Sequence, residues 1–232
     1  MKKFITESKH FLKIGIPIFG SQLSYMIMHT TDTIVSGQYD SKELAGLVLA
    51  NAFTFPIYML FQGIMFAITP IVAQLFGSRE FQKIGQKMRQ IFWVAIMNAF
   101  LVFFIFIFFS KVLPYFPLDE EILIISSNYL QAVSVGMFFY IMFRFLSSYS
   151  EGMTLTLPVF YVVLFGALIN IPLDIIFAFG YFGVPEMGSV GCGYATSIIS
   201  MTMFFLILKI ILSNKLYKKT ELLKEFDGPS LK

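Results

Sequence analysis

Charged residues are scarce in this chain of 232 residues, at 13% of the sequence against roughly 25% in soluble domains. Because 57% of the residues are apolar, a soluble domain of this size would lack the charge to cover them, and we exclude a soluble fold. The single cysteine, Cys192, excludes an intramolecular disulfide and a cysteine metal cluster. We interpret it as a small packing residue, and we expect no nucleic-acid partner for a chain with a net charge of only +3.

Long apolar runs stand where charge is missing, and a run of about 20 such residues is typical of a membrane-spanning helix. Lipid offers the backbone no hydrogen-bond partner, so a span is a helix or part of a closed barrel. Barrel strands alternate apolar and polar residues, whereas residues 100–109 do not alternate. We therefore predict an all-α polytopic protein in the lipid bilayer, with spans at about 11–37, 44–76, 84–109, 122–149, 157–182 and 191–212. The first span is predicted to be uncleaved, and residues 213–232 to form a polar cytoplasmic linker or tail.

The orientation of these spans follows from the positions of Lys and Arg, which are enriched in short cytoplasmic loops. Of the 17 basic residues, only Lys42 and Lys111 fall on one side of the membrane. The others lie in the N-terminal segment, between the second and third spans, near the end of the fourth span, or at and beyond the end of the sixth. Both termini are therefore predicted to be cytoplasmic.

Two acidic residues stand out, because only Asp32 and Asp174 of the 14 lie well inside predicted spans. A charge at the bilayer centre costs about 2.5 to 3.5 kcal/mol on insertion scales, so such residues are usually functional. At about 1.5 Å per residue, both lie about 7 to 12 Å below the outer boundary. Asn170 shares a helix face with Asp174, and Thr196 enters the sixth span to a similar depth. We predict that these four residues form one polar layer, whose oxygens suit Na⁺ or a relayed proton.

A structural interpretation of each polar residue stays open, in which each is satisfied locally and Thr196 bonds its own backbone. His29 lies three residues before Asp32 and is a candidate for tuning that carboxylate, although a lone histidine also packs. Pro17 and Pro172 are candidates for helix bends beside the buried acids, a common device in transporters, or for packing alone.

Three segments resemble the multidrug and toxic compound extrusion (MATE) family. Residues 22–37, which end in Asp-Thr-Ile-Val-Ser-Gly, resemble the family's first helix, and Pro-Ile-Val-Ala-Gln-Leu-Phe-Gly at 70–77 resembles the end of its second. The stretch 151–196 is similar to the bacterial, NorM-like branch. It contains Glu-Gly-Met-Thr at 151–154, Asn-Ile-Pro-Leu-Asp at 170–174 and Gly-Ser-Val-Gly-Cys-Gly-Tyr-Ala-Thr at 188–196. The resemblance covers essentially the whole chain.

That resemblance implies multidrug efflux by antiport with Na⁺ or H⁺ across the cytoplasmic (inner) membrane. It implies bulky, cationic, often aromatic drugs as substrates, with no enzyme chemistry, no catalytic residue and no cofactor. By the same resemblance, Asp32, Asn170, Asp174 and Thr196 match the family's N-lobe cation site, and Pro17 matches the bend of the first helix.

The resemblance also implies that this chain is one lobe, because family members have twelve helices in two similar lobes with the drug path between them. We expect it to act with a separate C-terminal lobe or a second copy, and not to transport alone. A truncated, non-transporting remnant is the alternative.

Two further alternatives are weaker. An exporter of lipid-linked sugars from the same wider superfamily would need several cations for phosphate, and Arg144 is the only candidate inside a span. An intramembrane aspartyl protease would carry Gly-x-Gly-Asp, whereas Asp174 follows Ile-Pro-Leu.

Overall fold

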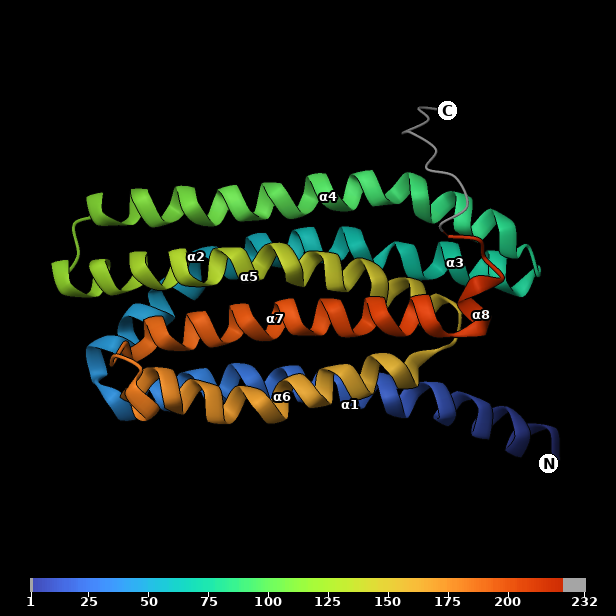
Figure 1. The fold of residues 1–232 in the computed structure, drawn as a ribbon, viewed down its shortest axis with the longest axis horizontal. Coiled ribbons are helices and arrows are strands. Elements are labelled where there is room, and N and C mark those ends of the chain that lie inside the picture. Colours follow the sequence, from blue (N-terminus) through green and yellow to red (C-terminus); the bar gives the residue numbers. More distant parts are fainter. Residues whose placement is uncertain (1, 223–232) are drawn as a thin grey trace.

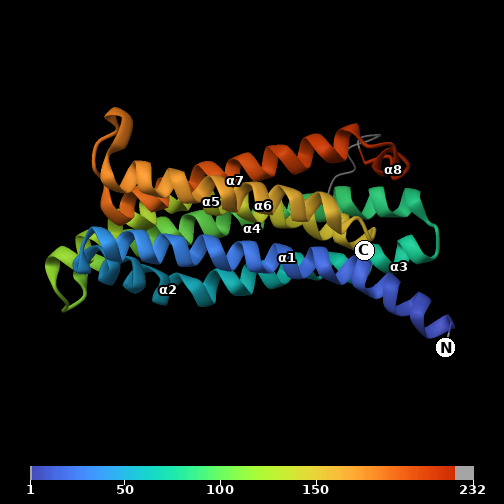
Figure 2. The same cartoon turned by 90° about the horizontal axis from the view of Figure 1, so that it is seen from below.

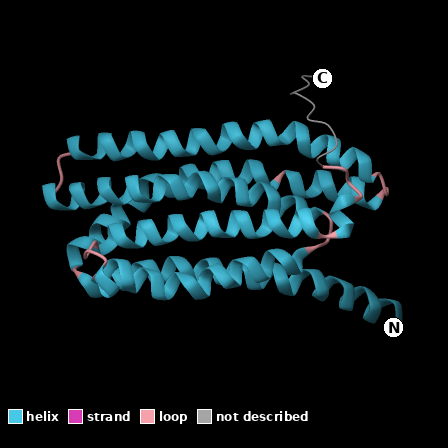
Figure 3. Ribbon diagram, in the orientation of Figure 1, coloured by secondary structure: helices cyan, strands magenta, loops and turns pink. Residues whose placement is uncertain are grey.

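The computed structural model describes the backbone of residues 2–222 and the side chains of residues 8 and 11–222. Every regular element in that part is a helix (Figures 1 and 3). The long helices are α1 (Lys2–Tyr39), α2 (Ser41–Phe66), α4 (Phe81–Val112), α5 (Glu120–Gly152), α6 (Thr156–Phe179) and α7 (Gly188–Ser213). The short ones are α3 (Ile68–Gly77), η1 (Leu113–Tyr115), η2 (Tyr181–Gly183) and α8 (Lys215–Lys218). Six stretches of the described residues are long and apolar enough to cross a membrane, so the predicted all-α polytopic fold is confirmed.

The long helices lie side by side in one elongated bundle (Figures 1 and 2). Its central member is α5, which contacts α2, α3, α4, α6 and α7, while α1 packs on α6, α2 and α7. Turns at residues 40, 116–119 and 184–187 meet at one end, here named the Asp40 end. Turns at 78–80, 153–155 and 214 meet at the other, here named the Asn214 end, where α1 also begins.

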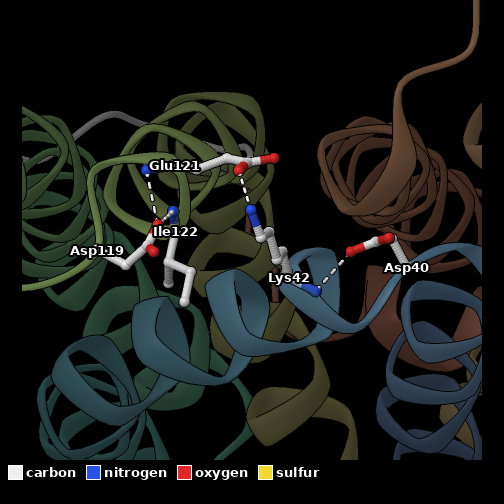
Figure 4. Close-up of polar contacts among 5 residues, drawn as sticks. All are labelled: Asp40, Lys42, Asp119, Glu121 and Ile122. Carbon is white, nitrogen blue, oxygen red and sulfur yellow. Dashed lines mark hydrogen bonds and ion pairs between the residues drawn. The ribbon is translucent and has the colours of Figure 1, made fainter.

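Polar side chains cap two helices at the Asp40 end (Figure 4). Asp40 accepts a hydrogen bond from the Lys42 backbone N–H at 2.7 Å and so caps α2. Asp119 caps α5 by accepting from the N–H groups of Glu121 at 3.0 Å and Ile122 at 3.3 Å. An ion pair between Lys42 and Glu121 then joins the two capped helices. The caps satisfy N–H groups that the first turn of a helix leaves without partners.

The span predicted at 44–76 is one candidate span in the structure, Ser41–Gly77, but its helix is interrupted once. Its two parts, α2 and α3, meet at Ala67, three residues before Pro70. A proline has no N–H, and its ring clashes with the carbonyl four residues earlier, which here belongs to the last residue of α2. Pro56 lies inside α2 without ending it.

Helices α5 and α7 touch at backbone distance because a glycine stands between them. A Cβ atom added at Gly136 would lie 2.5 Å from the Cα of Ser197. The Gly136 N–H donates to Ser197 Oγ at 3.1 Å, and that hydroxyl donates to the Ala132 carbonyl at 2.7 Å. Small residues of this kind allow membrane helices to approach closely.

The predicted linker begins as a packed segment rather than a free one. Tyr217 is 2% exposed, and its ring centroid lies 5.5 Å from that of Tyr149 in α5. The hydroxyls of Tyr149 and Thr220 share a hydrogen bond of 2.7 Å. An aromatic side chain and a hydroxyl with partners on the bundle thus hold the start of the segment 213–232 in place. Residues 223–232 of that prediction lie outside the described residues.

Candidate functional site

The four residues predicted to form a polar layer lie together, on helices α1, α6 and α7. Asn170 stands between the two acids: its Nδ2 lies 3.1 Å from Asp174 Oδ1 and 3.5 Å from Asp32 Oδ1. From α7, the hydroxyl of Thr196 donates to Asp32 Oδ2 at 3.4 Å rather than to its own backbone. Asp32 is 5% exposed, and Asp174 and Asn170 are 0% exposed.

The four residues of this layer come from three helices, and they meet because each lies near the Asp40 end of its own helix. Asp32 is seven residues from the end of α1, and Asp174 is five from the end of α6. Thr196 is eight residues from the start of α7, which runs the opposite way. The contacts of α1 with α6 and α7 then bring the three positions into register.

The acids in this layer are not paired with a lysine or an arginine of the described residues. Neither Asp32 nor Asp174 takes part in an ion pair there. Two buried oxygens, Asp174 Oδ2 and Asn170 Oδ1, also have no hydrogen-bond donor. A buried acceptor without a partner costs about 1–3 kcal/mol, more when it is charged. The layer therefore presents carboxylate and amide oxygens to a cation or a proton, and these are hard ligands.

A cavity of about 490 Å³ adjoins the layer, and Asp32, Thr196 and His29 are part of its wall. Asn170 and Asp174 are absent from that wall. Asp32 is therefore the one of the two carboxylates that also lines the cavity, and Thr196 of the layer lines it too. His29 makes no hydrogen bond to a described side chain, so its suggested tuning of Asp32 stays a prediction.

The prolines near the layer lie inside continuous helices. Pro17 is within α1, and Ser21 Oγ donates to its carbonyl at 3.0 Å. Pro172 is within α6, between Asn170 and Asp174. The N-terminal stretch of α1 diverges from the bundle (Figures 1 and 2), but a bend assigned to Pro17 stays a prediction.

Asn51 and Tyr129 are among the polar residues of the cavity wall that sequence reasoning missed. Asn51 carried a signal, since it is an amide ten residues into a membrane-spanning helix. Tyr129 carried none, because a tyrosine in a span is also ordinary packing. The aromatic part of the wall includes Tyr25, Tyr58 and Tyr140, whose rings pack edge to face at centroid distances of 6.0 and 6.1 Å.

A multi-pass helical bundle that keeps two buried carboxylates beside a cavity is an arrangement that occurs in membrane transporters. A sequence model of the MatE family matches residues 17–176. The multidrug resistance protein MdtK of Yersinia pestis (strain Pestoides F) is 30% identical over 230 residues, which are 99% of this chain and 50% of MdtK. The multidrug resistance protein NorM of Photobacterium profundum is 31% identical over 232 residues, which are 100% of this chain and 51% of NorM. This chain belongs to the MatE family, the multidrug and toxic compound extrusion family.

Solved structures share the fold. The eukaryotic MATE transporter AtDTX14 superimposes with a TM-score of 0.85 at 15% identity, over 96% of this chain and 49% of that one. The Vibrio cholerae MATE transporter VcmN in its bent form gives 0.80 at 19% identity, over 97% and 50%. The chain spans about half the length of the relatives that it matches, so its six spans correspond to one lobe of a MATE transporter.

Proposed function

We propose that this chain is the N-terminal lobe of a multidrug exporter that expels organic, often cationic drugs in exchange for Na⁺ or H⁺. The observation that carries the proposal is the pair of buried acids, Asp32 and Asp174, held together by Asn170 without a cationic partner among the described residues. A cation or a proton supplies the missing charge balance. The names of the MdtK and NorM relatives support the drug substrates.

Coupling of drug export to ion entry follows from the position of Asp32, which belongs to the polar layer and also lines the cavity. A drug cation in the cavity and a coupling ion in the cluster compete for the same carboxylate. Binding of one therefore weakens binding of the other, which is the requirement for antiport. A second lobe, or a second copy of this chain, gives the bundle a surface to rock against during alternating access.

We further propose that the protein lies in the cytoplasmic membrane with both termini in the cytoplasm. The Asn214 end then faces inward and the Asp40 end, with Lys42 and Lys111, faces outward. Reporter fusions after residue 212 test this orientation. A reporter found outside the cell would overturn it.

The function is tested by efflux of a fluorescent cationic dye from cells that make this chain with the C-terminal half of the NorM relative. We expect ion-gradient-dependent efflux, and we expect Asp32→Asn and Asp174→Asn each to abolish it. Glu120→Gln, which removes an exposed acid at the Asp40 end, is the matched control and should not change efflux. Full activity of both Asn variants at normal expression would show that the site assignment is wrong.

The same cells without the NorM half decide between the remaining alternatives. We expect no efflux from the 232 residues alone. Efflux that disappears with Asp32→Asn would instead indicate a functional homodimer. No efflux with either arrangement would indicate a non-transporting remnant.

A further inference from the structure

The start of α7 is capped by a carboxylate from another helix. Glu43 of α2 accepts hydrogen bonds from the Ser189 backbone N–H at 2.8 Å and from the Ser189 hydroxyl at 2.5 Å. Met187, the N-cap residue of α7, makes no side-chain cap of its own. The first N–H groups of a helix need acceptors, and its N-terminus favours a negative charge. Glu43 therefore takes the place of the missing cap.

The backbone at Gly188 leaves room for that carboxylate. Gly188 has a φ of 55°, in the left-handed region that glycine adopts without strain. A Cβ atom at this position would lie 2.5 Å from Glu43 Cδ. Ser189, which follows it, is 0% exposed. Any side chain at position 188 would therefore push Glu43 away from the start of α7.

The capped start of α7 also touches the two helices that carry the acids, about one turn from each acid. A Cβ atom added at Gly191 would lie 2.6 Å from the carbonyl carbon of Phe177, three residues after the acid of α6. The Ser36 hydroxyl, four residues after the acid of α1, donates to the Cys192 sulfur at 3.8 Å. The start of α7 is therefore fixed against both acid-bearing helices just before the chain reaches Thr196.

The same cap joins a helix of the cavity wall to the helix that carries Thr196. Glu43 precedes Asn51 of the cavity wall by eight residues in α2, and Ser189 precedes Thr196 by seven residues in α7. At about 1.5 Å per residue, these are about 10 to 12 Å of continuous helix on each side. Because α7 packs mainly on α5 and α6 and only lightly on α2, the cap is an important part of the contact between α2 and α7.

We propose that Glu43 is a positioning residue of the ion site. By capping α7 it holds Thr196 at the depth of Asp32, where the threonine hydroxyl reaches the carboxylate. Glu43 acts through the helix and does not touch the ion. Its effect on ion affinity rests on the proposed function, whereas its effect on the position of α7 stands on the geometry alone.

Ion binding to the purified full chain in lipid nanodiscs tests this role, measured as binding of radioactive Na⁺ and as proton uptake in weakly buffered solution. Glu43→Ala should weaken ion binding by about three- to tenfold, because part of a charge-assisted contact is transmitted to Thr196. Glu43→Gln keeps an acceptor without the charge and should fall between Glu43→Ala and the wild type. Ser189→Ala added to Glu43→Ala should cause little further loss, because the contact that the two residues share is already absent.

Two glycine variants separate the cap from backbone strain. Gly188→Ala places a methyl group against the Glu43 carboxylate and should weaken ion binding as Glu43→Ala does. Gly183→Ala is the matched control: its φ is 85°, so the backbone strain is similar, but the added Cβ meets no described atom within 4 Å. It should leave ion binding unchanged. Equal weakening by the two variants would overturn the proposal, because strain alone would then explain the loss.

Amide hydrogen exchange separates positioning from general stability and from the proposed function. In Glu43→Ala, faster exchange should extend along α7 from Ser189 to Thr196 and leave α4 unchanged. Faster exchange confined to the first turn of α7, an equal rise in α4, or unchanged ion affinity in Glu43→Ala would each overturn the proposal. If the wild-type chain binds neither Na⁺ nor protons, the ion-coupled mechanism fails, and exchange along α7 still decides whether Glu43 holds Thr196 in place.

Discussion

The polar layer and the surroundings of Arg144 hold buried charges of opposite sign in one bundle. In the layer, two carboxylates lack a cation and are surrounded by an amide and a hydroxyl from neighbouring helices. Around Arg144, a buried guanidinium is surrounded by aromatic rings, and the carboxylate of Glu151 acts on it electrostatically. The two charges do not neutralise each other, because they lie at different depths and form no ion pair in the described part of the chain.

The contrast shows how the surroundings select the ligand. Amide and hydroxyl groups hold the oxygens of Asp32 and Asp174 close together, which suits a small, hard cation or a proton. Aromatic rings contact the guanidinium of Arg144, and these cation–π contacts stabilise its charge inside the bundle. The carboxylates of the layer are thus left for a coupling ion, whereas the arginine is stabilised by its own neighbours.

Removal of the bridging amide should have the largest effect on this contrast. Asn170→Leu takes away the donor that both carboxylates share, and a hydrogen bond to a charged group is worth about 1.5–3 kcal/mol. We expect Na⁺ or proton affinity to fall by about tenfold to a hundredfold, measured by ion-dependent thermal stabilisation.

Asn98→Leu is the matched control for Asn170→Leu. Asn98 is another buried asparagine, in α4, and its amide donates to the Phe61 carbonyl at 3.1 Å. Its loss should lower stability without changing ion affinity. An equal loss of ion affinity in both variants would mean that Asn170 acts only through the stability of the bundle.

A smaller effect is expected at the contact of α5 and α7. Gly136→Ala puts a methyl group against the backbone of Ser197, and overpacking of this kind costs about 1–3 kcal/mol. The bundle should unfold at lower temperature. Because Thr196 adjoins Ser197, the variant should also weaken ion binding. Unchanged ion affinity would contradict the assignment of Thr196 to the ion site.

The smallest effect is expected from Tyr149→Phe, which removes the hydrogen bond to Thr220 and keeps the ring packing. Stability should fall by about 0.5–1.5 kcal/mol. Neither ion affinity nor dye affinity should change, since the contact lies outside the polar layer and the cavity. A change in either would show that the packed start of the linker is coupled to the binding sites.

The spans and the polar layer could be predicted from the sequence because both depend on the number of residues along one segment. Apolar length identifies a span, and the distance of Asp32 and Asp174 from the span ends gives their depth. The break at Ala67 was not predicted, since Pro56 and Pro70 look alike in the sequence and only one interrupts the helix. The packing of Tyr217 was missed because most residues beside it in the sequence are polar, and nothing in that pattern marks one ring as buried.

The surroundings of Arg144 could not be derived from the sequence for a similar reason. Arg144 was visible as a lone cation in a span, but its neighbours depend on how the helices pack. Phe66 and Tyr25 come from two other helices, and their distances to the guanidinium are set by packing. Asn51 and Tyr129 likewise join the cavity wall only through the arrangement of α2 and α5.

We propose that Asp32 serves the coupling ion and the drug in turn. This exchange can be measured by adding the cationic ethyl ester of rhodamine B to the purified chain in weakly buffered solution, while recording pH and free Na⁺. Dye binding should release a proton or a Na⁺ ion from the wild-type chain, and Asp32→Asn should abolish the release. Dye binding without any release, or an equal release from Asp32→Asn, would contradict it.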